Sequence, residues 1–166
     1  MLDQAVQLFG LPQAIHVDMA KLRPDAVTTD YFHATLIYPQ RRVVLHSSAL
    51  VAAPQPRFQL HGTKGSYVKY DMDPQEAHLK AGDYPPQAEW GYALRDGVLT
   101  LATSDGLVEK TLPTVPGNYP HYYAAIRDAL HGIGENPVTA EQAIQVMELI
   151  ELGVRSAETG QTVSLA

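Results

Sequence analysis

Three side chains that can hydrogen-bond a small polar ligand stand together in the last third of the sequence. Tyr119, His121 and Tyr122 lie at the start of a segment with helical periodicity. Phenol hydroxyls and imidazole nitrogens donate and accept hydrogen bonds, and a few such groups on a fixed element orient a ligand in a cleft. We predict that at least one of them binds substrate. The competing interpretation is core packing for Tyr122 and a solvent-facing His121.

A further acidic candidate, Asp3, lies near the start of a helix predicted over residues 1–10, with Leu2, Val6 and Phe9 on one face. Its carboxylate could face a ligand cleft and contact substrate there. A carboxylate in the first turn of a helix is also favoured by the helix dipole alone. Asp3 is therefore predicted as a substrate-side residue, with the dipole as the competing explanation.

Three histidines, His33, His46 and His61, fall on neighbouring predicted strands. Three imidazoles can bind zinc, but the spacing contains no H-x-H or H-x-x-x-H pattern, so interface or cleft-wall roles are favoured and no metal site is predicted. No G-x-S-x-G motif surrounds any serine, which argues against a serine hydrolase. The serines concerned are Ser47, Ser48 and Ser156. Two further residues are expected to have structural roles: Lys64 as a solvated turn residue and Trp90 as a loop anchor.

Composition narrows the class of protein. The chain has 166 residues, a formal net charge of -6 and no cysteine. The acidic balance disfavours nucleic-acid binding, and the absence of cysteine excludes disulfides and thiolate chemistry. No apolar run approaches the roughly 20 residues that span a bilayer, and no signal-peptide pattern is visible. We expect a single cytoplasmic domain over residues 1–166 with no membrane or nucleic-acid partner.

The elements that must position the candidate residues are strands followed by helices. Strands are predicted over 14–19, 30–38, 42–53, 57–61, 66–70, 92–94, 98–103, 107–112 and 162–165, and helices over 1–10, 74–80, 119–131 and 139–157. Tight turns are expected at Gly62–Gly65, Asp96-Gly97 and Asp105-Gly106. The order predicts an α+β fold: a mostly antiparallel, open β-sheet with helices packed on one face.

Two helices carry stronger local signals. Thr139 and Gln142 form a capping-box pattern at the start of the last helix. The apolar stripe of that helix is predicted as Ala143, Met147, Ile150 and Val154, and the inward face of the helix over 119–131 as Tyr122, Ile126 and Leu130. Both faces of the strand over 30–38 are partly apolar, which indicates that each face is covered by a helix or by another protein surface.

Four segments in order along the chain are similar to conserved stretches of the Gfo/Idh/MocA oxidoreductases. Asp3, Leu8 and Gly10 fit the helix that follows the family's G-x-H-x-x-D motif. Residues 58–66 resemble its v-x-G-t-x-G-s hairpin, residues 116–124 its P-G-x-Y-x-x-F/Y-Y helix entry, and residues 136–163 its P-V-t … S-A-x-x-G-x-x-V ending. The ordered set identifies the chain as the C-terminal, substrate-side domain of such an enzyme.

The resemblance implies a function that is shared between two domains. A Rossmann domain binds NAD or NADP, and the second domain lines a cleft for a sugar, polyol or related carbinol. The open sheet of that second domain commonly makes the homodimer or higher homo-oligomer contact. Hydride then passes between nicotinamide and a carbinol carbon, while a lysine of an E-K-P motif and the histidine of G-x-H-x-x-D handle the proton.

The chain departs from the family's full pattern. Counting back three positions from Asp3 places the motif histidine immediately before Met1, and neither the E-K-P lysine nor a G-x-G-x-x-G loop is present. The expectation is therefore a Rossmann domain absent from this chain, no cofactor bound by it, and no activity by the isolated fragment. The alternative is a stand-alone sheet module for oligomerisation or small-ligand binding without catalysis.

Overall fold

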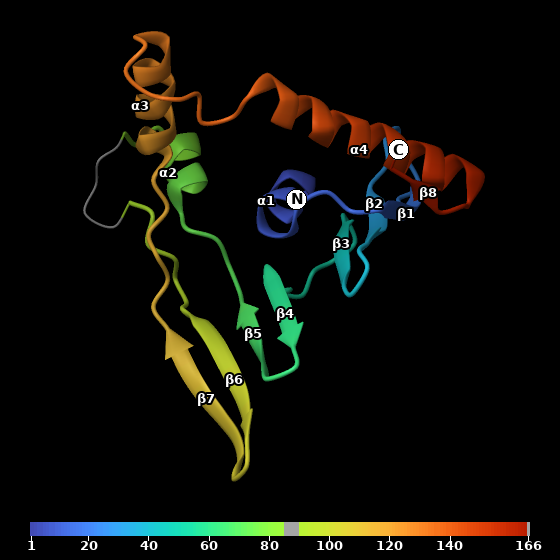
Figure 1. Ribbon diagram of the computed structural model, residues 1–166, viewed down its shortest axis with the longest axis horizontal. Helices are drawn as coiled ribbons and strands as arrows, with labels where there is room; N and C mark the ends of the chain where they lie inside the picture. Colours follow the sequence, from blue (N-terminus) through green and yellow to red (C-terminus); the bar gives the residue numbers. More distant parts are fainter. Residues whose placement is uncertain (85–89, 166) are drawn as a thin grey trace. The chain divides into compact units, whose positions relative to one another are not determined.

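The computed structural model describes residues 1–84 and 90–165, which form two compact units. Unit 1 comprises Met1–Ala52 and Val138–Ala166, and unit 2 comprises Ala53–Pro137 (Figure 1). Each unit has its own antiparallel sheet, so each is described by itself. The expectation of a single domain over residues 1–166 stays a prediction.

Unit 1 contains a four-stranded sheet, here called sheet A, in the order β3-β2-β1-β8. Its strands are β1 (Ala14–Ala20), β2 (Tyr31–Ile37), β3 (Arg42–Ser48) and the short β8 (Val163–Ser164), all paired antiparallel. Strand β3 ends earlier than the predicted 42–53. Side chains alternate between the two faces of a strand, which places Phe32, Ala34 and Leu36 on one face of sheet A.

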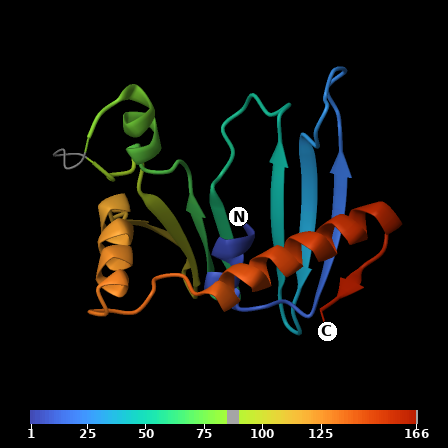
Figure 2. The ribbon, with the colours of Figure 1, turned by 90° about the horizontal axis from the view of Figure 1, so that it is seen from above.

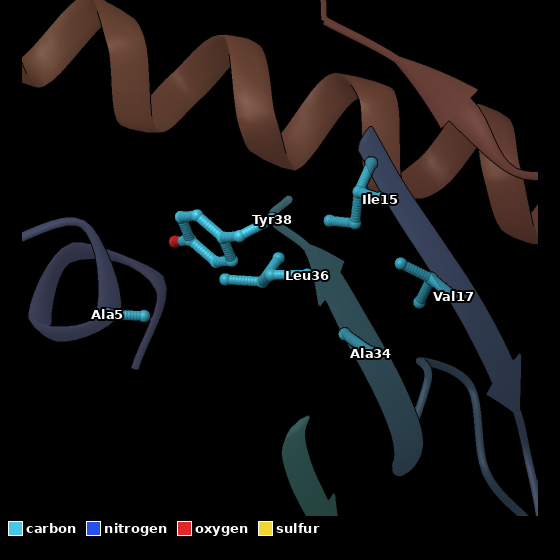
Figure 3. Packing of buried hydrophobic residues seen from close by; sticks show 6 residues of the cluster. All are labelled: Ala5, Ile15, Val17, Ala34, Leu36 and Tyr38. Carbon is cyan, nitrogen blue, oxygen red and sulfur yellow. The ribbon is translucent and has the colours of Figure 1, made fainter. Parts of the chain in front are cut away.

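That face is covered by two helices, α1 (Leu2–Phe9) and α4 (Ala140–Thr159), and α4 runs across the strands (Figure 2). The buried cluster between them consists of Ala5, Ile15, Val17, Ala34, Leu36 and Tyr38 (Figure 3). The Tyr38 hydroxyl donates to the Gly10 carbonyl at 2.9 Å, and burial raises the pKa of this phenol. Apolar burial of this kind is the main source of stability for unit 1.

Helix α4 begins and ends as its sequence predicts. Thr139 accepts a hydrogen bond from the Gln142 amide at 3.3 Å while the Gln142 side chain accepts from the Thr139 amide at 2.9 Å, and Gly160 ends the helix in the left-handed conformation. The predicted apolar stripe is wrong by one position along the helix. Met147 and Val154, which it includes, are exposed. The residues buried against sheet A are Leu149, Gly153 and Ser156.

Unit 2 contains a second four-stranded sheet, sheet B, in the order β4-β5-β6-β7. Its strands are β4 (Phe58–Gly62), β5 (Gly65–Lys69), β6 (Gly97–Thr103) and β7 (Gly106–Leu112). The predicted turns at Gly62–Gly65 and Asp105-Gly106 close the two hairpins. The predicted strand over 92–94 and the turn at Asp96-Gly97 are wrong: Gly97 opens β6, and the Asp96 carboxylate accepts the Thr114 amide at 2.8 Å.

Two helices lie at the end of unit 2 opposite the β6–β7 turn, α2 (Gln75–Ala81) and α3 (Tyr119–Leu130) (Figure 1). Helix α3 has no buried residue. Its predicted inward face is wrong for Tyr122 and Leu130, which are exposed, whereas Ile126 is half-buried.

The described residues confirm the α+β fold class, with open antiparallel sheets and with helices on one face of sheet A. Within them, no helix is long and apolar enough to cross a membrane.

Candidate functional site

The predicted substrate residues of unit 2 lie at a firmly capped helix start. The Asn118 side chain accepts a hydrogen bond from the His121 amide at 3.0 Å, and Pro120 occupies the first turn, where its missing N–H costs nothing. Tyr119 and Tyr122 are 39% and 45% exposed. The structure therefore brings these two phenols and His121 to one exposed helix end, where they can donate hydrogen bonds to a ligand.

The start of α3 is tied to a buried glutamine. Gln75 is wholly buried, and its Oε1 accepts the Tyr119 amide at 2.8 Å. Its Nε2 donates to Oδ1 of Asp73 at 2.8 Å, and its own backbone amide donates to the same oxygen at 3.1 Å. A buried polar group is costly unless it is paired, and each polar atom of this side chain has a partner. Gln75 thus links the turn before α2 to the start of α3.

Close backbone approaches keep this link compact. A Cβ on Gly117 would lie 2.4 Å from both Oδ2 of Asp73 and Nε2 of Gln75. The Gly117 amide donates to the carbonyl of Gly91 at 2.9 Å, and a Cβ on Gly91 would lie 2.1 Å from the Gly117 carbonyl oxygen. Gly91 also has a φ of 101°, which side chains rarely adopt. Both positions therefore require glycine.

Strand β5 is joined to the loop before β6 by charged groups. Arg95 donates two hydrogen bonds to the carboxylate of Asp71, at 2.6 and 3.0 Å, and its guanidinium lowers the pKa of that carboxyl. The Lys69 ammonium, on a buried residue, donates to the carbonyls of Tyr70 and Arg95. These contacts hold the loop against the end of β5.

Trp90 anchors the same loop. It is 8% exposed, and its ring centroid lies 5.6 Å from that of His78, which in turn contacts the Asp83 carboxylate at 2.8 Å. This agrees with the predicted loop-anchor role of Trp90.

Asp3 lies in unit 1, in the first turn of α1. It borders a pocket of about 410 Å³ between α1, the covered face of sheet A and α4. The other lining residues are apolar: Met1, Leu2, Ile15, Val17, Met19, Phe32, Ala34, Leu45, Val146, Leu149, Ile150 and Gly153. Because Asp3 and the α3 residues belong to different units, each is described in its own unit, and a shared substrate role for them stays a prediction.

The remaining candidate residues make contacts within the fold of their own unit. His33 and His46 pair across β2 and β3 with ring centroids 5.6 Å apart, and His61 of unit 2 contacts the Ser66 hydroxyl at 2.9 Å. In the described part of the chain, no group of three or more histidine or acidic side chains has the geometry of a metal site. Ser156 is wholly buried; its Oγ accepts the Val17 amide at 3.0 Å and donates to the Gln161 carbonyl at 2.6 Å, so it is structural.

The glycines that could suggest a phosphate-binding loop are turn residues. Gly62 and Gly65 face each other across the β4–β5 hairpin, whereas a dinucleotide loop joins a strand to the N-terminus of a helix. These glycines therefore do not fit the pyrophosphate of NAD or NADP. Sequence reasoning missed Gln75 and Asp73, and the available signal was their position at the start of α2 and just before it, in a loop-rich stretch.

The fold of the described residues, with its two open antiparallel sheets and four helices, can be compared with the folds and sequences of known proteins. Residues 1–165 match the family model described as the oxidoreductase family, C-terminal alpha/beta domain. The chain belongs to this family. The predicted Gfo/Idh/MocA membership is thereby confirmed.

The relatives extend the comparison. The chain is 63% identical over 166 residues to the uncharacterized oxidoreductase YdgJ of Escherichia coli (strain K12) and 36% identical over 167 residues to scyllo-inositol 2-dehydrogenase (NADP(+)) IolW of Bacillus subtilis (strain 168). These matches cover 100% and 99% of this chain but 48% and 47% of the relatives. The chain thus spans about half the length of the curated relatives it matches.

Two solved structures are similar to the chain over the same extent. The YPO2259 protein of Yersinia pestis superposes with a TM-score of 0.96 at 56% identity, covering 99% of this chain and 47% of that one. An oxidoreductase from Bacillus cereus superposes with a TM-score of 0.87 at 30% identity, covering 99% and 49%. The fold is that of the family.

Proposed function

We propose that this chain is the substrate-side and oligomerisation domain of an NAD(P)-dependent oxidoreductase that acts on a sugar, polyol or related carbinol. The observation that carries the proposal is the family match over residues 1–165, together with the 36% identical relative named as a scyllo-inositol 2-dehydrogenase. That relative is named for a polyol and for NADP(+). The proposal transfers the substrate class, and no single substrate, to this protein.

The nicotinamide would supply the redox chemistry by accepting a hydride from the carbinol carbon, and the hydroxyl proton would pass to the motif lysine or histidine of the cofactor domain, which would leave a carbonyl. The hairpin glycines Gly62 and Gly65 do not fit the pyrophosphate, so the cofactor would be held by that other domain. The residues of this chain would bind and orient the substrate. Tyr119, His121 and Tyr122 offer hydrogen bonds to the hydroxyls that do not react, and Asp3 is the further candidate.

Self-association is proposed through one face of sheet B. Paired residues of an antiparallel sheet share a face, so the strand register places seven apolar side chains together: Phe58, Leu60, Tyr67, Leu99, Leu101, Val108 and Leu112. The same face also carries Lys69 and Lys110. Leu60, Leu112 and Val108 are each about two-fifths exposed, at 41%, 39% and 42%. The opposite face carries mainly polar side chains, including Gln59, Ser66, Thr100 and Glu109.

A second copy is the occupant that suits this apolar face. Four strands of five to seven residues, about 4.8 Å apart, present an area on the order of 400 Å² per copy, which is about half of what each partner buries in a standard specific interface. An isologous contact also needs no partner of complementary charge. We therefore expect the chain to form a homodimer or a larger homo-oligomer.

The catalytic part of the proposal is tested with the full-length protein on a panel of polyols and sugars with NAD and NADP. We expect reduction of the dinucleotide with at least one polyol, and no measurable dinucleotide binding by residues 1–166 alone in calorimetry. An inert full-length protein would contradict the substrate class. Micromolar dinucleotide binding by this chain would contradict the proposal that a separate domain binds the cofactor.

The association is tested with a matched pair of variants on β6. Leu101→Lys places a charge on the apolar face of sheet B, whereas Ala102→Lys places the same charge on the opposite face. Sedimentation of the chain should show dissociation for Leu101→Lys alone. A monomeric wild-type chain at all concentrations would refute the proposed self-association.

A further inference from the structure

We propose that Gln75 is a positioning residue for the substrate site, because its buried amide fixes the start of α3 and hence Tyr119, His121 and Tyr122. The inference rests on the proposed function. Gln75 is wholly buried and contacts the helix start at the Tyr119 amide, so it acts on the substrate only through the exposed side chains of α3.

The first reason is that Gln75 caps α3 from a distant part of the chain. The first amides of a helix have no partner within the helix. Asn118 satisfies one of them locally at His121, whereas the Tyr119 amide donates to Oε1 of Gln75, 44 residues away in the sequence. The position of the helix start is thereby set by a side chain outside the helix.

The second reason is that the Gln75 amide is held in one orientation. Oδ1 of Asp73 accepts from Nε2 of Gln75, which directs Oε1 toward the Tyr119 amide. Gly117 leaves just enough room, since any Cβ there would collide with both side chains. A buried amide with both ends paired cannot rotate without breaking a hydrogen bond.

The third reason is that α3 has little else to hold its first turn. The helix has no buried residue, and Tyr119, His121 and Tyr122 are exposed. A small displacement of the helix start would therefore move all three side chains together. Displacement of a binding group by about 1 Å is enough to lower kcat/KM by a large factor.

The test uses the full-length protein, oxidation of scyllo-inositol and a polyol panel with NADP, and four variants. Gln75→Met keeps the size of the side chain and removes both hydrogen bonds. Gln75→Glu sets two carboxylates against each other, at positions 73 and 75. The double variant Asp73→Asn with Gln75→Glu reverses donor and acceptor between the two side chains, although the backbone amide of residue 75 then loses its acceptor on residue 73, so the pairing is restored in part. Ser156→Ala removes a buried hydrogen-bonding side chain from unit 1 and serves as the matched control.

We expect kcat/KM for the polyol to fall about tenfold or more in both single Gln75 variants, chiefly through KM, with KM for NADP unchanged. The double variant should recover part of the loss, and Ser156→Ala should leave KM for the polyol at the wild-type value. Equal effects of Gln75→Met and Ser156→Ala, an unchanged KM for the polyol, or no recovery in the double variant would each overturn the inference. A wild-type protein inert on the whole panel would refute the proposed function, and this inference with it.

Discussion

Unit 1 and unit 2 have sheets of the same size and pairing, yet their interiors differ. Sheet A is covered by α1 and α4, and its buried side chains are aliphatic or aromatic. In unit 2 the buried residues include Lys69, Gln75, Gly91 and Gly97, and Trp90 is the only large apolar side chain among the described buried ones. Every residue of β7 is exposed.

The difference shows that two antiparallel sheets of one chain reach stability by different routes. Unit 1 depends on apolar burial, which does not require side chains to meet in one fixed orientation. Unit 2 depends on paired polar groups and on close backbone contacts, which fail when one atom is out of place. On sheet B, the apolar side chains Leu60, Val108 and Leu112 are each about two-fifths exposed, and the proposed second copy would cover them.

The largest effect should come from a side chain placed in the backbone contact of unit 2. Gly91→Ala meets the Gly117 carbonyl and holds a φ of 101°, so it should cost about 3 kcal/mol or more of unfolding free energy. Gly132→Ala is the control, because Gly132 also has a positive φ but has open space around its Cβ position. Urea unfolding followed by the fluorescence of Trp90, the only tryptophan, measures unit 2. Equal costs for the two variants would show that the contact is unimportant.

A smaller loss is expected in unit 1 from its one wholly buried serine. Ser156→Ala leaves the Val17 amide and the Gln161 carbonyl without a partner, which should cost about 2 kcal/mol. Hydrogen exchange should show the loss at β1 and α4, with the amides of sheet B unaffected. Ser47→Ala, at an exposed position of β3, should change stability little. A loss spread evenly over both sheets would contradict the separation of the two units.

Gly153→Ala should change the stability of unit 1 in the opposite direction. The added Cβ would lie 3.4 Å from Val17 and 3.5 Å from Ile15, which is ordinary contact. Replacing a mid-helix glycine by alanine should then add about 0.5–1 kcal/mol. Thermal unfolding followed by circular dichroism measures the gain. A loss of stability would mean that this side of α4 tolerates no added methyl group, and that unit 1 is packed as tightly as the glycine contacts of unit 2.

The smallest effect concerns the exposed ion pair of unit 2. The pKa of Asp71 is lowered in the folded protein by Arg95, so the pair stabilises the fold above the ordinary carboxyl pKa and the stabilisation is lost as the pH falls through the lowered value. Asp71→Asn keeps a residue that tolerates the left-handed φ of 57° and removes the charge. Its urea midpoint should be lower than that of the wild type at neutral pH and equal to it in strong acid. A difference that persists in strong acid would assign the effect to conformation.

Much of the fold follows from local sequence signals. The capping box at Thr139, the turn at Asp105-Gly106 and most strand positions are local features, and the structure has them. The face of α4 is different, because the helix packs through Gly153 and Ser156, two residues that hydrophobicity ignores. Their selection depends on how closely β1 approaches the helix, which is a tertiary property.

The candidate site could be predicted only in part. The exposed residues at the start of α3 follow from the sequence pattern around Asn118 and Pro120. The role of Gln75 does not, because a glutamine is usually a surface residue and its partners, Asp73 and Tyr119, come from different segments. Only the folded chain reveals that its amide is buried.

The hydrogen bond between Val17 and Ser156 joins residues 139 positions apart, because the whole of unit 2 is inserted between the two parts of unit 1. On the ribosome, the segment that forms unit 2 emerges before α4 is made. The part of the apolar face of sheet A that α4 covers therefore stays exposed while unit 2 is synthesised. Its closure by α4 then carries the entropic cost of closing a long loop. Once it has formed, the apolar core of unit 1 tolerates small changes in orientation better than the polar contacts of unit 2 do. During synthesis, however, unit 1 is the part of the chain most exposed to aggregation.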